Sequence, residues 1–156
     1  MSKKILFVCT GNTFRSASAE YLFKAFLAQH QDNSFIVSSA GTRGNPYGVY
    51  RETEQRVKSH GGDMSGHHYM VLDQDIVDNA DLIICMAAHH QEFVKKHFGA
   101  KSFLFNELAY GKSTDLKDDD EAYGEYEDLG DFIYETVDTI WEGLPVLYEK
   151  IQSMDL

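Results

Sequence analysis

Near its N-terminus the chain reads Ile5-Leu6-Phe7-Val8-Cys9-Thr10-Gly11-Asn12-Thr13-Phe14-Arg15-Ser16. The four apolar residues predict a buried strand, and the apolar residues beyond Arg15 recur at helical spacing, so the segment between them is predicted to be a tight loop entering a helix. Such a loop directs several backbone N–H groups to one point, where the helix dipole adds positive charge. The loop is therefore predicted to bind an anion, with Arg15 recognising phosphate-like oxygens. The same field favours the thiolate form of Cys9, which would face the anion as a nucleophile.

Outside this loop, strands and helices alternate along the chain. Strands are predicted at 3–10, 34–38, 81–86 and 102–105, and helices at 15–30, 50–60, 87–98 and 132–151. Pro145 is expected to kink or interrupt the last helix. The alternation predicts an α/β fold, namely a small doubly wound four-stranded parallel sheet with helices on both faces, formed by residues 1–156 as a single domain. Cys9 falls at the carboxyl end of its strand, where ligands bind in such sheets.

The composition excludes several classes of partner. A net charge of −11 argues against binding to nucleic acid or to an anionic membrane surface. No apolar run approaches the length of a membrane span and no signal peptide is evident, which predicts a cytoplasmic protein. The two cysteines, Cys9 and Cys85, do not form a disulfide framework and are too few for a four-thiolate zinc site. Cys85 lies within an apolar run and is predicted to be a buried core residue; the sequence leaves the oligomeric state open.

Three further segments extend the pattern of the first loop. They are Ser39-Ala40-Gly41-Thr42, a histidine at His67 after the second helix, and the strand Asp81-Leu82-Ile83-Ile84-Cys85-Met86. Together with Cys9-x-Gly-Asn-x-x-Arg-Ser16, they resemble the low-molecular-weight protein tyrosine phosphatase family over most of the chain. The resemblance implies a phosphomonoester hydrolase that dephosphorylates phosphotyrosine in phosphorylated proteins through a phosphocysteine intermediate, without a metal or other cofactor.

The resemblance also assigns roles to individual residues. It implies that Cys9 is the nucleophile and that Arg15 binds phosphate and stabilises the transition state. The remaining phosphate-binding loop residues are Thr10, Gly11, Asn12, Thr13, Phe14 and Ser16. The side chains of Asn12, Ser16, Ser39 and His67 match family positions that hold the loop in shape. Ser16 is also placed to hydrogen-bond the sulfur of Cys9, which would help that sulfur to leave in a second step.

The general acid is the first departure from the family pattern. The family carries Asp-Pro-aromatic before its last helix, but neither Pro46 nor Pro145 follows an aspartate here. The corresponding region reads Asp115-Leu116-Lys117-Asp118-Asp119-Asp120-Glu121-Ala122-Tyr123-Gly124. Matching Asp-Leu-x-Asp favours Asp118 and matching Asp-x-x-Tyr-Gly favours Asp120; we prefer Asp118, with Asp119 and Asp128 as further alternatives. Crowded like charges would raise some of these pKa values, although the region also reads as a solvated charged loop.

Phe14 and Thr13 are the other departures. Many family members have a second cysteine at the position of Phe14, which forms a protective disulfide with the nucleophile, so this redox switch is expected to be absent. Thr13 resembles the residue found in protein-arginine phosphatases of the same fold, which makes phosphoarginine the alternative substrate. An arsenate reductase is disfavoured because it needs additional cysteines.

Two alternatives concern substrate contacts and activity. Four tyrosines are candidates for stacking a phosphotyrosine ring, with surface or core positions equally expected for each: Tyr47, Tyr50, Tyr123 and Tyr126. A catalytically weak module that binds phosphoproteins is the alternative from another functional class, because the acid segment departs from the working pattern.

Overall fold

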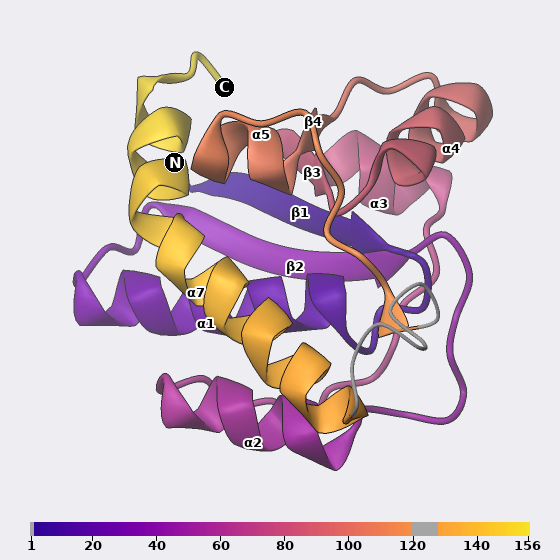
Figure 1. Cartoon of the computed structure of the whole chain (residues 1–156). Coiled ribbons are helices and arrows are strands. Elements are labelled where there is room, and N and C mark those ends of the chain that lie inside the picture. Colours follow the sequence, from indigo (N-terminus) through magenta and orange to yellow (C-terminus); the bar gives the residue numbers. More distant parts are fainter. Residues whose placement is uncertain (1, 120–127) are drawn as a thin grey trace.

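A central parallel sheet organises the computed structural model, which describes residues 2–119 and 128–156 (Figure 1). The strands are β1 (Lys3–Cys9), β2 (Phe35–Gly41), β3 (Leu82–Cys85) and β4 (Phe103–Leu104), in the order β2-β1-β3-β4. All the strand pairs are parallel, and β1 pairs with β2 along its whole length, from Lys3 opposite Phe35 to Cys9 opposite Gly41. Cys9 thus ends a central strand, next to the end of its neighbour.

Helices cover both faces of this sheet, as the sequence predicts. They are α1 (Arg15–Gln29), α2 (Arg51–Ser59), α3 (Gln74–Asn79), α4 (Ala88–Phe98), α5 (Phe105–Tyr110) and α7 (Leu129–Ser153). The larger apolar core joins one face of the sheet to α1, α2, α5 and α7, and a smaller core joins the other face to α3 and α4. Figure 1 shows α7 passing α1 with its first turns over α2. The doubly wound α/β prediction is confirmed.

The two cysteines belong to different cores. Cys9 is part of the larger core, whereas Cys85 is part of the smaller one together with Leu6 and Val8. Cys85 is fully buried, and this burial raises its pKa to about 12. The prediction that Cys85 is a core residue is therefore confirmed.

The sequence prediction is wrong for several elements. Strand β2 continues past the predicted end at Ser38 to Gly41, because Ser39 to Gly41 still pair with β1. The last strand ends at Leu104 and not at the predicted Phe105, because Phe105 is fully buried as the first residue of α5. Helix α5 ends at Gly111, which adopts the left-handed region with a φ of 68°. The short helix α3 was not predicted; the side chain of Asp73 caps it by accepting from the N–H of Ile76.

Helix α7 starts earlier than predicted and continues past Pro145 to Ser153. Asp128 caps its first turn by accepting from the N–H of Gly130 at 2.8 Å. Buried apolar residues on both sides of Pro145 include Leu144 and Leu147, and their packing offsets the loss of one helical hydrogen bond. Pro145 therefore does not interrupt the helix, although its last turns run in a different direction from its first (Figure 1). Within the described residues, no helix combines the length and apolar character required to span a membrane.

Candidate active site

The loop between β1 and α1 has a strained backbone. Asn12 is fully buried and has a φ of 58°, in the left-handed region that residues other than glycine rarely adopt. Its N–H donates to the sulfur of Cys9 at 3.3 Å. No side chain caps the N-terminus of α1 at Phe14, so the N–H groups of the first turn are available donors for an anion. This geometry is compatible with the predicted anion cradle, which stays a prediction.

The side chain of Asn12 ties this loop to its surroundings. Its Nδ2 donates to Ser16 Oγ at 3.0 Å and to Ser39 Oγ at 2.8 Å, and its Oδ1 accepts from the N–H of Met70 at 2.9 Å. Ser39 in turn donates to Glu20 Oε1 at 2.6 Å. Every polar atom of the Asn12 side chain is therefore used, which holds the residue in its strained conformation.

His67 holds the same loop from another side. Its Nε2 donates to the backbone carbonyl of Asn12 at 2.7 Å, since a carbonyl can only accept. The hydroxyl of Tyr21 lies 3.0 Å from His67 Nδ1, and burial raises the pKa of Tyr21 to about 12. Tyr21 therefore keeps its proton, and in the neutral imidazole with the proton on Nε2 its hydroxyl donates a hydrogen bond to Nδ1 and fixes the ring. The structure brings together Asn12, Ser16, Ser39 and His67, as the resemblance implies.

Cys9 faces this network and the cleft at once. Its side chain is 2% exposed, and its sulfur lies 2.9 Å from Ser16 Oγ. When Cys9 reacts as the thiolate, its sulfur can only accept, so the Ser16 hydroxyl is then the donor of this hydrogen bond. This donation stabilises negative charge on Cys9.

Arg15 is almost completely buried behind the loop. Its Nη1 donates to the carbonyl of Leu116 at 2.8 Å, and its Nη2 lies 3.3 Å from Asp118 Oδ2. The N–H of Leu116 donates to the carbonyl of Met86 at 2.8 Å, which anchors this segment beside β3. Arg15 Nε is buried and has no hydrogen-bond partner among the described residues. The guanidinium thus keeps a donor that a bound oxyanion could satisfy.

Asp118 is a carboxylic acid that holds its proton to a higher pH than an ordinary aspartate does. Burial raises the pKa of Asp118 to about 6, although the charge of Arg15 works against this increase. Its Oδ1 accepts from the N–H of Asp119, and Asp119 accepts from the hydroxyl of Tyr50 at 2.6 Å. The other candidate acids differ, because Asp128 caps α7 and Asp120 lies outside the described residues.

A cleft of about 560 Å³ connects these groups. The loop before α1, the segment 43–50 and the pair Asp118–Asp119 line it. Tyr47 is 95% exposed and Tyr50 stands at the rim, whereas Tyr123 and Tyr126 lie outside the described residues. The Phe14 ring packs on Phe132 with the two centroids 5.8 Å apart.

Two residues of the site were missed by the sequence reasoning. The Nδ1 of His90 accepts from the N–H of Ala87, so its Nε2 carries the proton and donates to Thr10 Oγ1 at 2.9 Å. Burial, with the charge of Arg15, lowers the pKa of His90 to about 2 and keeps it neutral. Asn45 donates to Thr13 from the opposite wall. The sequence shows only that His90 follows a strand and that Asn45 lies in a Gly/Pro-rich loop, and neither position predicts a role in the site.

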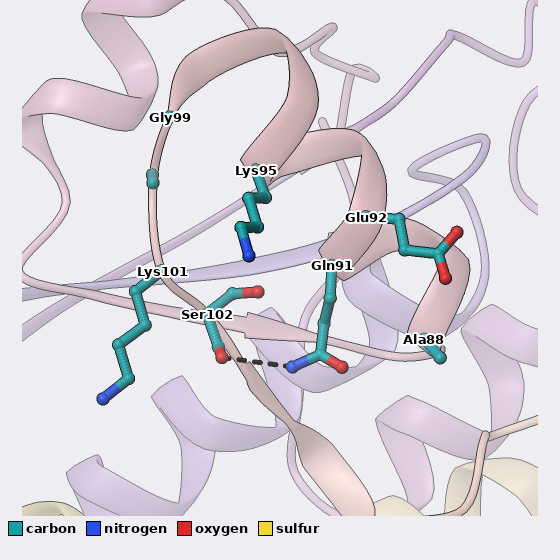
Figure 2. A pocket seen from close by; sticks show the side chains of 8 residues that line it. Ala88, Gln91, Glu92, Lys95, Gly99, Lys101 and Ser102 are labelled. Carbon is teal, nitrogen blue, oxygen red and sulfur yellow. Dashed lines mark hydrogen bonds between the residues drawn. The ribbon is translucent and has the colours of Figure 1, made fainter.

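A second hollow, of about 470 Å³, lies beside α4 (Figure 2). Gln91 crosses it to donate to the carbonyl of Ser102 at 3.1 Å. The charged ends of Glu92 and Lys101 point away from each other. Two lysines and a serine are among the residues that line this hollow, but no cysteine is, in contrast to the cleft at Cys9. Among residues 2–119 and 128–156, no three His, Cys, Asp or Glu side chains are arranged to hold a metal ion.

Comparisons with known proteins agree with this geometry. Residues 4–154 match the family model of low molecular weight phosphotyrosine protein phosphatases. The chain is 32% identical over 117 residues to the low molecular weight protein-tyrosine-phosphatase PtpB of Staphylococcus aureus, covering 71% of this chain and 76% of PtpB. It is 33% identical over 119 residues to a protein-arginine-phosphatase of Bacillus subtilis, covering 73% of this chain and 77% of that protein.

The structural comparison extends over more of the chain. A mutant of YwlE from Bacillus subtilis superposes with a TM-score of 0.83 and 28% identity, covering 97% of this chain and 100% of that one. The strand–loop–helix unit that carries Cys9 and Arg15 lies within the matched residues. The chain belongs to the low molecular weight phosphotyrosine protein phosphatase family.

Proposed function

We propose that the protein removes phosphate from phosphotyrosine in proteins and that Cys9 carries the phosphoryl group between two displacements. The observation that carries this proposal is that Cys9 and Asp118 line one cleft, with the guanidinium of Arg15 3.3 Å from Asp118. Phosphoryl transfer needs an in-line nucleophile, donors around the equatorial oxygens and an acid for the leaving oxygen. These three residues, with the backbone of the loop, supply each requirement.

In the first displacement, the thiolate of Cys9 attacks phosphorus and the bond from phosphorus to the tyrosyl oxygen breaks. Asp118 gives its proton to that oxygen, so the product leaves as a neutral phenol. The N–H groups of the loop and the guanidinium of Arg15 bind the three equatorial oxygens. When phosphate replaces Asp118 as a partner of the Arg15 guanidinium, Arg15 would keep its hydrogen bond to the carbonyl of Leu116.

In the second displacement, water attacks phosphorus while Asp118, now a carboxylate, accepts a proton from it. The bond between sulfur and phosphorus breaks, and the electron pair returns to Cys9. The hydroxyl of Ser16, 2.9 Å from the sulfur, stabilises this thiolate as it leaves. A solved YwlE arginine phosphatase, a cysteine-to-serine mutant with 28% identity and a TM-score of 0.82, has a phosphorylated active site serine, which supports a covalent intermediate at the position of Cys9. A reducing compartment such as the cytoplasm would keep Cys9 a free thiol.

Phosphoarginine is the second candidate substrate, because Thr13 lines the cleft and a protein-arginine-phosphatase is among the relatives. The two substrates differ in the atom that leaves, an oxygen in one case and a guanidinium nitrogen in the other. Steady-state kinetics with phosphotyrosine and phosphoarginine peptides of the same sequence would rank them. We expect the higher kcat/KM for phosphotyrosine.

The test of the enzyme proposal compares the protein with its Cys9→Ser variant on p-nitrophenyl phosphate. Equal rates for the two would rule out the enzyme and leave the phosphoprotein-binding module. Asparagine substitutions of Asp118, Asp119, Asp120 and Asp128 then identify the acid. The true acid loses more activity on an alkyl phosphate than on an aryl phosphate, because the poorer leaving group depends more on protonation. We expect this pattern for Asp118; the same pattern at Asp120 would transfer the role.

A further inference from the structure

His90 is a buried ionisable residue that the proposed mechanism does not use. It is fully buried as the third residue of α4. Its Nδ1 lies 3.1 Å from the N–H of Ala87, and its Nε2 lies 2.9 Å from Thr10 Oγ1. The imidazole therefore connects the β3–α4 link (residues 86–88) to the second residue of the phosphate-binding loop.

The two contacts require a neutral imidazole with its proton on Nε2. A backbone N–H can only donate, so Nδ1 must carry a lone pair toward Ala87. Burial, followed by the charge of Arg15, lowers the pKa of His90 to about 2, which keeps the ring neutral at physiological pH. Nε2 is then a donor, and Thr10 Oγ1 accepts its hydrogen bond. His90 thus adds a directed hydrogen bond to the loop without adding charge.

Thr10 is held through both its main chain and its side chain. Its carbonyl accepts from the N–H of Arg43 at 3.0 Å, and its hydroxyl accepts from His90. Thr10 lines the cleft next to Cys9, and the following residue, Gly11, has no side chain that could hold the loop. Because glycine has the greatest backbone freedom, the conformation of the loop at this point depends on the hydrogen bonds of its neighbours.

The β3–α4 link also supports the acid segment. The N–H of Leu116 donates to the carbonyl of Met86 at 2.8 Å, and the N–H of Ala88 donates to Asp115 Oδ1 at 2.8 Å. The link therefore holds the chain that leads to the proposed acid. Through His90, the same link also holds the phosphate-binding loop.

We propose that His90 is a positioning residue that fixes Thr10 to the β3–α4 link and so holds the phosphate-binding loop in the shape that receives phosphate. Because the link also holds the acid segment, His90 helps to set the position of the loop relative to Asp118. The effect on the reaction is indirect, since His90 is fully buried and acts through Thr10. This proposal rests on the proposed phosphatase function and adds a residue on which phosphate binding depends.

Asparagine and glutamine would each keep one of the two hydrogen bonds of His90. The Oδ1 of an asparagine lies close to the position of Nδ1 and can accept from Ala87, but this shorter side chain does not reach Thr10. The amide nitrogen of a glutamine lies close to the position of Nε2 and can donate to Thr10, but the N–H of Ala87 then loses its partner. His90→Asn therefore removes the contact with the loop, and His90→Gln keeps it.

NMR titration with inorganic phosphate is the first measurement, because a dissociation constant does not depend on how much of the protein is folded. We expect His90→Asn to weaken phosphate binding about tenfold, as the loss of one buried hydrogen bond does. His90→Gln should stay within about threefold of the parent, because the bond to Thr10 is kept. The value of kcat/KM on p-nitrophenyl phosphate should fall by similar factors.

A double-mutant cycle shows whether His90 acts through Thr10. Thr10→Val removes the same hydrogen bond from the loop at nearly constant shape. We therefore expect His90→Asn to change the phosphate affinity much less when it is added to Thr10→Val than when it is added to the parent. An equal change in both backgrounds would overturn the proposal. Equal losses of affinity in His90→Asn and His90→Gln would also overturn it and assign His90 to the fold alone.

Phosphate binding separates failure of this proposal from failure of the proposed function. If the parent shows Cys9-dependent turnover and His90→Asn binds phosphate as the parent does, the role of His90 is refuted and the phosphatase function stands. If the parent binds phosphate but is no faster than Cys9→Ser, the function is refuted, and the affinities of the two His90 variants still decide the role of His90. If the parent neither binds nor hydrolyses, both are refuted. Thermal unfolding of each variant shows whether the affinity describes a folded protein.

Discussion

Replacing Asp118 by asparagine should weaken catalysis and, at the same time, stabilise the fold above about pH 6. The two effects have one cause, namely the burial that raises the pKa of Asp118. A buried carboxyl keeps its proton to a higher pH, which suits a general acid. The same burial makes the ionised form costly to the folded protein, and an asparagine does not ionise.

The magnitude follows from the size of the pKa change. The pKa of Asp118 rises from 3.8 to about 6, and each unit corresponds to about 1.4 kcal/mol. The full cost of ionisation is therefore up to about 3 kcal/mol, with the side chain 26% exposed. A raised carboxyl pKa means that the folded state binds the proton more tightly than the unfolded state. Stability is therefore lost as the pH rises from 3.8 to about 6 and stays at the lower level above that range.

Urea unfolding at about pH 4 and about pH 7.5 measures this difference, because Asp118→Asn should match the parent at the lower pH and exceed it at the higher one. Asp119→Asn, at the adjacent position in the same cleft, should change this pH dependence less, because burial and not Asp119 is the largest cause of the raised pKa of Asp118. In the same preparations, kcat on an alkyl phosphate should fall by about 10²–10⁴ in Asp118→Asn.

A lower stability of Asp118→Asn than of the parent at the higher pH would contradict this expectation. That result would mean that the attraction between Asp118 and Arg15, 3.3 Å apart, exceeds the cost of burying the carboxylate. A parent-like kcat on the alkyl phosphate would separately remove Asp118 from the role of acid.

Three further predictions concern neighbouring parts of the molecule. Peroxide should inactivate the parent irreversibly, whereas activity of Phe14→Cys should return on adding a thiol reductant, because a disulfide between the introduced cysteine and Cys9 would prevent further oxidation of Cys9. Equal recovery of activity in both proteins would contradict this. His90→Leu leaves the hydroxyl of Thr10 and the N–H of Ala87 without their hydrogen-bond partner, so it should lower the free energy of unfolding by about 1–3 kcal/mol. A urea unfolding midpoint equal to that of the parent would show that these hydrogen bonds do not add to stability. The hydrogen bonds of Arg56, and then of His60, lower the pKa of Asp138, so Asp138→Asn should lower stability by about 1 kcal/mol at neutral pH. Because a lowered carboxyl pKa stabilises the fold only while the group is ionised, this loss should shrink in acid unfolding curves as the pH falls through the folded pKa of Asp138.

The parts of the fold that the sequence predicts correctly are those with a long local pattern. β1 and α1 show an apolar run and a helical repeat over many residues, and both are confirmed. The helices α3 and α5 have only six residues each, too few for a periodic pattern to appear. Helix α5 is set instead by the burial of Phe105 and Leu108 against α7, which is a contact between distant parts of the chain.

The same distinction applies to the site. Cys9, Arg15 and Ser16 occur in one short motif, so their proximity can be read from their spacing. Asn45 and His90 reach the loop only because the strands end side by side, and they contact Thr13 and Thr10 from 32 and 80 positions away. No local sequence pattern identifies such residues, because their contacts depend on how the folded loops orient the amide of Asn45 and the imidazole of His90.

The backbone of the acid segment is held in place without the proline of the family motif. In the family pattern, a proline after the aspartate restricts the backbone next to the acid. Here the backbone of Leu116 is held at both ends, since its N–H donates to Met86 and its carbonyl accepts from Arg15. Asp118 follows two residues later and is thereby brought to the guanidinium of Arg15. Main-chain bonds of this kind do not depend on residue type, so the missing proline does not by itself predict a loss of catalysis. The missing proline is therefore no longer an argument for the alternative of a catalytically weak binding module.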